Sequence, residues 1–187
     1  MKKNALIAAL LAVSFPVCQA SNDNTKANGS PGPTATAVAK THLRSILEGD
    51  NKKLADTYAA KIVLMPGHEL LKEEHGLAGP KGRKEAMTVT RTNLLITMEK
   101  AREEWRKPPG EKIDELLKTL AFESIKVEIG DNATDPSDPV DTPDGKLHFK
   151  IKDGDALVKV APPKGDFLLF QLRQIDGKWR VVAEYLD

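Results

Sequence analysis

The chain has 187 residues, and its 28 Lys and Arg against 27 Asp and Glu give a formal net charge of +1. Proteins that bind nucleic acid or anionic membranes in general carry a basic excess, so near-neutrality argues against both classes. The single cysteine, Cys18, lies among the first twenty residues. The rest of the chain therefore has no disulfide, no thiol nucleophile and no thiolate metal site.

Residues 1–20 have the pattern of an export signal. Two lysines precede an apolar run over 5–13, and Cys18-Gln19-Ala20 supplies small residues before a cleavage point. The run is too short to cross a bilayer as a helix, which takes about 20 residues. We therefore expect a cleaved signal peptide, a periplasmic or secreted protein, and no membrane attachment afterwards. The alternative, a lipoprotein acylated at Cys18, is disfavoured because residues 15–17 fit a lipobox poorly.

Residues 21–36 are expected to form a disordered leader. They are rich in Asn, Ser, Gly and Pro and contain no large apolar residue, so they cannot bury enough surface to fold. The remaining residues, 37–187, fit one domain large enough to have a hydrophobic core.

Helical spacing of apolar residues dominates the first half of this domain. It predicts helices over Thr36–Leu47, Asn51–Ala60, Arg83–Lys107 and 111–120. A glycine and an aspartate lie between the first two, as a stop and a cap. A short apolar run, Ile62–Met65, ends at Pro-Gly and predicts a buried strand.

The second half has the two-residue period of strands, with Asp-Gly pairs as tight turns between them. The expected strands are Phe122–Ile129, Leu147–Lys152, Asp155–Ala161, Phe167–Ile175 and Lys178–Leu186. Residues 131–144 carry five aspartates and three prolines, which predicts a surface excursion of undetermined role rather than a strand. Helices followed by strands predict an α+β fold, with the helices packed in a strongly curved antiparallel sheet.

Two phrases resemble the nuclear transport factor 2-like superfamily, which includes ketosteroid-isomerase-like and polyketide-cyclase-like domains. They are HLRSILEGD at His42–Asp50 and IDGKWRVV at Ile175–Val182. The resemblance covers about 37–187. It implies a cone-shaped, cystatin-like roll, usually with an internal pocket and often with a homodimer through the sheet. The acid–base residues of the enzymatic members match nothing here one by one, so the resemblance implies no catalytic residue.

Arg91 is the first candidate for ligand binding. It lies at the edge of the apolar face of the expected helix 83–107, where an unpaired charge is unfavourable. Its forked donors could anchor a carboxylate or phosphate in the cone. The alternatives are an ion pair with Glu123 or Glu184, or a side chain that extends to solvent.

His68 and the neighbouring Glu69 follow the first strand, near the expected cone mouth. A histidine beside a carboxylate could act as an acid–base pair, but adjacent strand residues point to opposite faces. With His75, the spacing matches no metalloprotease motif. We therefore expect a ligand contact at His68 or a plain surface loop, with no metal and no cofactor.

Tyr58, Trp179 and Gln171 complete the candidate ligand-binding residues. The two aromatic side chains each have an apolar body and a polar group, so they suit either a pocket wall or the core. Gln171 lies on the mixed face of the strand 167–175, which suits a pocket or a dimer contact. The opposite face, Leu168, Phe170 and Leu172, is expected to pack on the core.

Three functions remain open. The first is non-catalytic binding of a small molecule or peptide in the cone pocket. The second is an isomerase, dehydratase or cyclase with a carboxylate or histidine as general base. The third is a dimerising interaction module. A cone filled by side chains, with Arg91 paired internally, would count against both pocket functions. Neither enzymatic activity nor the ligand can be decided from the residues.

Overall fold

The helical half begins with two capped helices. The computed structural model describes residues 33–71, 75, 77, 85–104, 110–125, 140–142, 145–147, 149–163 and 167–186. Helix α2 (Ala35–Glu48) starts where the Thr34 side chain accepts the Ala37 N–H at 3.2 Å. It ends at Gly49, whose φ of 71° is left-handed and favours glycine. Within the described residues, no helix is long and apolar enough to cross a membrane.

Asp50 then caps helix α3 (Asn51–Thr57) by accepting the Lys53 N–H at 3.0 Å. A 3₁₀ turn, η1 (Glu69–Leu71), follows the first strand. Two later helices, α4 (Arg91–Glu104) and α5 (Gly110–Thr119), complete the helical layer. Arg44 of α2 forms an ion pair with Asp114 of α5, which joins these two helices at the surface.

Six strands form one curled sheet in the order β2-β1-β8-β7-β6-β3. Four of its pairs are antiparallel, and β3, β6, β7 and β8 pair in succession as the expected antiparallel strands of the second half. Strands β1 and β8 run parallel, which the sequence did not predict. A separate hairpin joins β4 (Val140–Thr142) and β5 (Gly145–Leu147). The six strands are β1 (Tyr58–Leu64), β2 (Met87–Thr90), β3 (Ala121–Ile125), β6 (Ala156–Ala161), β7 (Leu168–Ile175) and β8 (Lys178–Tyr185).

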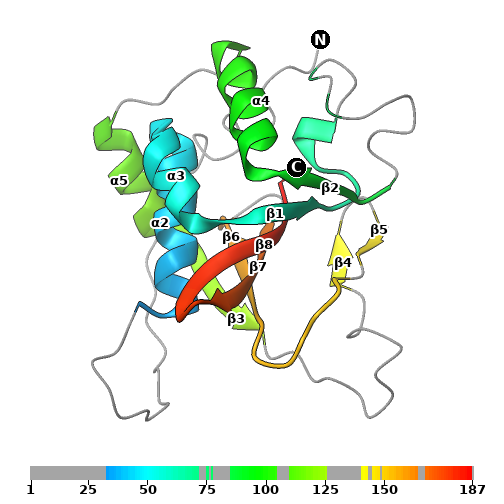
Figure 1. The fold of residues 1–187 in the computed structure, drawn as a ribbon. Helices are drawn as coiled ribbons and strands as arrows, with labels where there is room; N and C mark the ends of the chain where they lie inside the picture. Colours follow the sequence, from blue (N-terminus) through cyan, green and yellow to red (C-terminus); the bar gives the residue numbers. More distant parts are fainter. Residues whose placement is uncertain are drawn as a thin grey trace.

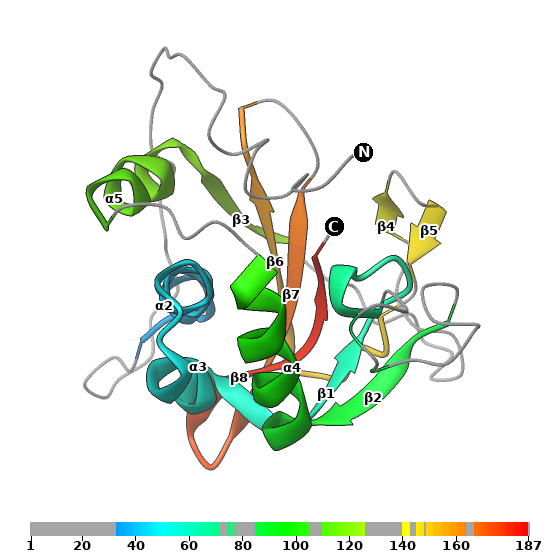
Figure 2. The ribbon, with the colours of Figure 1, turned by 90° about the horizontal axis from the view of Figure 1, so that it is seen from above.

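The helices cover one face of this sheet, as Figures 1 and 2 show. Helix α2 contacts β3, β6 and β8, and α4 contacts β1. The main core lies between these layers and includes Leu168, Phe170 and Leu172, which confirms the expected core face of this strand. The α+β class with a curved sheet is therefore confirmed.

The outer face of the sheet carries a second, smaller core. Leu169 of β7 and Tyr185 of β8 lie here, covered by Phe149, which is 1% exposed. Asp155 holds the covering segment in place, because its carboxylate accepts from Nε and Nη2 of Arg173, each at 2.7 Å, and from the Lys152 N–H at 2.8 Å.

The expected helix 83–107 was wrong over its first part. Met87–Thr90 is a strand, β2, paired antiparallel with β1 so that Leu64 opposes Met87. The Thr-Val-Thr sequence is β-branched, which favours the pleated conformation. The helix begins only at Arg91, where the Thr90 side chain accepts the Asn93 N–H at 3.3 Å.

Two expectations after β3 also need correction. Among the described residues of the expected strand Leu147–Lys152, only Leu147 lies in a strand. Farther along, a side chain takes the place of a neighbouring strand, since Gln171 donates to the Lys150 carbonyl at 2.9 Å. The excursion 131–144 was expected to hold no strand, yet Val140–Thr142 pairs with β5. Its residues 131–139 lie outside the described residues.

Candidate functional site

A carboxylate, Glu184, lies fully buried between the sheet and the helices. Along β8, Trp179 and Val181 pack toward the main core, and strict alternation would turn Glu184 to the outer face. The pairing with β7 shifts by one residue at Val182, since Leu172 opposes Val181 but Gln171 opposes Ala183. This β-bulge reverses the alternation, and Glu184 therefore points inward.

Three side chains surround the Glu184 carboxylate, and all of them are 0% exposed. The Tyr58 hydroxyl donates to it, at 2.9 Å from both oxygens. The Nε2 atom of His42 lies 3.2 Å from Oε2, and the Nε2 atom of His68 lies 3.2 Å from Oε1. The hydrogen-bonding capacity of this buried carboxylate is therefore met by neighbouring side chains.

Different elements bring the two histidines to Glu184. His42 comes from the buried side of α2, and its ring meets Tyr58 and Phe170 edge-on, with centroids 4.6 and 5.0 Å away. His68 follows β1, and its Nδ1 atom accepts the Leu70 N–H at 3.1 Å. Since that bond takes the Nδ1 lone pair, His68 carries its proton on Nε2 and donates to Glu184.

The ionisation of the cluster follows from these bonds. Burial raises the pKa of Glu184, but the hydrogen bonds of His42 and His68, followed by their electrostatic interactions with the carboxylate, outweigh burial and lower the pKa to about 2. Burial, and then the adjacent Glu184, raise the pKa of Tyr58 well above 10.0. At neutral pH the cluster therefore contains a carboxylate and a neutral phenol.

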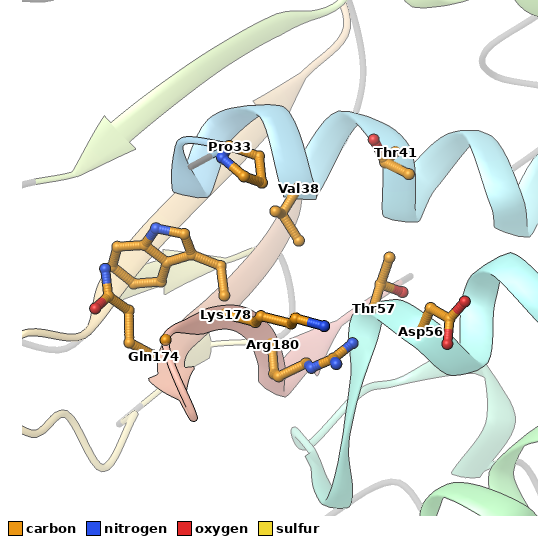
Figure 3. A pocket seen from close by; sticks show the side chains of 10 residues that line it. Pro33, Val38, Thr41, Asp56, Thr57, Gln174, Lys178 and Arg180 are labelled. Carbon is orange, nitrogen blue, oxygen red and sulfur yellow. The ribbon is translucent and has the colours of Figure 1, made fainter. Parts of the chain in front are cut away.

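A groove lies beside this cluster, between α2, α3 and the turn end of the β7–β8 hairpin. Its volume is about 440 Å³. Figure 3 shows Lys178 and Arg180 pointing toward Thr57 and Asp56. No described residue forms an ion pair with either of these two cations. The remaining lining residues are Pro33, Val38, Thr41, Gln174, Gly177 and Trp179.

Thr57 connects the groove with the buried cluster. It lines the groove, is 6% exposed, and its Oγ1 atom lies 2.7 Å from His42 Nδ1. The same oxygen lies 2.7 Å from the Leu54 carbonyl. Thr57 is thus a residue that both lines the groove and contacts His42 of the buried cluster.

The structure brings some of the sequence-predicted residues together and separates others. Tyr58 and His68 meet at Glu184, whereas Trp179 lines the groove. Arg91 pairs with neither expected carboxylate: its Nη1 donates to the carbonyls of Ala55 and Tyr58 at 3.1 and 3.4 Å.

Gln171 lies away from both places, on the outer face of the sheet. Its amide donates to the Lys150 carbonyl at 2.9 Å and to Asp155 at 2.7 Å. Among the described residues, no three His, Cys, Asp or Glu are arranged to hold a metal ion.

Side chains fill the described part of the cone. Leu94, Met98, Tyr58 and Phe170 are each 0% exposed, so no water-sized space touches them. Arg91 is paired within the protein, because its Nη1 donates to backbone carbonyls. A filled cone and an internally paired Arg91 both count against a ligand pocket within the cone. The groove outside the cone is the remaining candidate site.

The sequence reasoning missed His42 and the central position of Glu184. His42 had a readable signal, since it lies three residues after Ala39 and four before Ile46, on the buried side of α2. Glu184 lies in the apolar run Val181–Leu186, where a lone carboxylate invites a buried partner. The Glu184 side chain points inward because of the β-bulge, and no local sequence pattern predicts that bulge.

Comparisons with known proteins bear on the fold alone. No family model matches the chain, and no curated protein matches it. The solved structures similar to it include NTF2-like (nuclear transport factor 2-like) proteins of unknown function from Pseudomonas putida and Shewanella baltica. The first is 11% identical, with 79% of each chain covered and a TM-score of 0.37. The second is 10% identical, with 81% of this chain and 87% of that chain covered and a TM-score of 0.39.

A third similar structure, a protein of unknown function with a cystatin-like fold from Nostoc punctiforme, is 14% identical. The match covers 79% of this chain and 83% of that one, with a TM-score of 0.34. The first two titles name the superfamily that the two sequence phrases resemble, and the third names a cystatin-like fold. No activity or ligand is transferred from them.

Proposed function

We propose that this protein binds a small organic anion in the groove between α2, α3 and the β7–β8 hairpin, without catalysing a reaction on it. The observation that carries the proposal is the pair of cations, Lys178 and Arg180, in a groove of about 440 Å³. Small-molecule sites commonly measure about 300–1,000 Å³. With Asp56 as the third charged lining residue, the lining has a net charge of +1.

The chemistry of the lining favours an anion with an apolar part. Arg180 has a planar fork of donors that suits a carboxylate or phosphate, and Lys178 adds a second positive charge. Val38 and Pro33 lie across the groove from these two cations (Figure 3), and Trp179 adds a further apolar surface to the lining. An aromatic or aliphatic acid or phosphate ester matches both parts.

Binding is preferred over catalysis because of where the titratable groups lie. Glu184, His42 and His68, the groups that a proton-moving enzyme would use as its base, are all 0% exposed. A general base must come within hydrogen-bond reach of the substrate proton. Of the cluster and its direct contacts, only Thr57 lines the groove.

Isothermal titration calorimetry with phenyl phosphate tests this proposal. We expect binding to the unchanged protein and at least about tenfold weaker binding to the Lys178→Ala/Arg180→Ala variant, since each charge-assisted hydrogen bond contributes about 1.5–3 kcal/mol. The matched control, Lys61→Ala/Lys100→Ala, removes the same charge from exposed positions outside the groove. Equal affinity for the two double variants, or no binding to the unchanged protein, would contradict the proposal.

A further inference from the structure

The lining of the groove carries charges of both signs. Lys178 and Arg180 come from β8, where residues two positions apart point to the same side of the sheet. Asp56 comes from the last turn of α3 and lines the same groove. Figure 3 shows the two cationic side chains pointing toward the end of the groove where Asp56 lies. A molecule bound there therefore meets two cations and one carboxylate.

The protein itself does not neutralise these charges. Among the residues that the structure describes, Asp56 forms no ion pair with Lys178, Arg180 or any other basic side chain, and it is exposed to solvent. The last turn of α3 contains no basic residue, and Lys53, earlier in this helix, is paired with Asp50 at 3.1 Å. The carboxylate and the two cations are thus all available to a partner from solution.

The position of Asp56 affects which acids the groove binds well. An acid held by Lys178 and Arg180 brings its negative charge close to the Asp56 carboxylate, and like charges placed next to each other are unfavourable. An ammonium group on the same acid replaces this repulsion by an attraction, while the acid group keeps both cations. Binding sites commonly obtain specificity from such a combination, in which one ligand is attracted and its competitor is repelled.

The apolar part of the lining determines the rest of the ligand. Trp179 and Val38 are half-buried and line the groove, and Val38 lies across from the two cations (Figure 3). These side chains offer apolar surface to an aromatic or aliphatic group. A ligand that matches every part of the lining has a carboxylate and an ammonium on the same carbon atom and an apolar side chain. An apolar α-amino acid has this arrangement.

We infer that the groove selects apolar α-amino acids over the corresponding simple acids, and that Asp56 is the residue responsible for this selection. The carboxylate of the amino acid binds Lys178 and Arg180, its ammonium binds Asp56, and its side chain packs against Trp179 and Val38. The inference rests on the proposed function, because it names the class of acid that the same groove binds.

Isothermal titration calorimetry with L-phenylalanine and 3-phenylpropionate tests the inference, because these two probes differ only in the ammonium group. The variant Asp56→Asn removes the charge and keeps the size of an exposed side chain. Asp153→Asn is the matched control, because Asp153 is also exposed but does not line the groove.

The unchanged protein and Asp153→Asn should bind L-phenylalanine about fivefold more tightly than 3-phenylpropionate, which corresponds to a strong exposed ion pair. Asp56→Asn should bind L-phenylalanine more weakly than the unchanged protein does and should bind the two probes about equally. Equal affinity of the unchanged protein for the two probes, or a full preference retained in Asp56→Asn, would overturn the inference. Phenyl phosphate binding would then still support the proposed function, whereas a failure of all three compounds to bind would overturn both.

Discussion

Replacing Glu184 by Gln tests the buried cluster through its effect on stability. The side chain keeps its shape and loses its charge, and its amide N–H groups cannot accept from both histidines. The folded-state pKa of about 2, against an ordinary value of 4.5, means that folding favours the ionised form. The ionised carboxylate therefore contributes stability above pH 4.5, and this contribution is lost as pH falls toward 2.

The size of the effect follows from the two pKa values. A difference of about 2.5 units corresponds to about 3 kcal/mol, of which about 2 kcal/mol is lost between pH 5 and pH 3. Urea unfolding should show this loss in the unchanged protein and a smaller one in Glu184→Gln. At pH 7 the variant should be less stable by about 3 kcal/mol, since donors are left unpaired in the core.

Glu123→Gln is the matched control, because Glu123 is an exposed carboxylate on β3. It should change the unfolding free energy at pH 7 by no more than about 0.5 kcal/mol and keep the full loss between pH 5 and pH 3. Parallel pH profiles for Glu184→Gln and the unchanged protein would refute the ionised, histidine-bonded carboxylate.

Two further predictions concern the outer face of the sheet and the start of the chain. Asp155→Asn should lower the unfolding free energy by about 1–3 kcal/mol and speed amide exchange over 149–152, because Arg173 loses its carboxylate; unchanged exchange there would contradict the role of Asp155. We also propose that export removes residues 1–20 and that the mature chain dimerises through the sheet. Native mass spectrometry of the protein from its own host should then give twice the mass of a chain beginning at Ser21. A monomer would contradict dimerisation, and an uncleaved chain would contradict removal of the signal.

Local sequence patterns were sufficient for most of the helices and turns. Gly49, with φ of 71°, ends α2 as its position between two helical runs predicted. The Asp176-Gly177 pair was expected as a tight turn, and both residues have positive φ, 51° and 72°, as such a turn requires. These features depend on residues close together in the chain, which is why the sequence indicated them.

Features that depend on distant pairing could not be predicted in this way. Met87–Thr90 continues the helical spacing of the residues after it, but pairing with β1 makes it a strand. Glu184 turns inward only because β8 bulges against β7 at Val182. Tyr58 and His68 were expected near a pocket, yet the carboxylate that joins them lies more than 100 positions away.

Chemical-shift mapping with phenyl phosphate tests the central claim, binding in the groove, most directly. The predicted result is a saturable shift of the Trp179 indole N–H together with the backbone amides of Thr41 and Thr57, all of which line the groove. The Ile96 amide, on the exposed side of α4, should not move. Shifts confined to other surfaces, or none at the highest concentration of the ester, would contradict the proposed binding site.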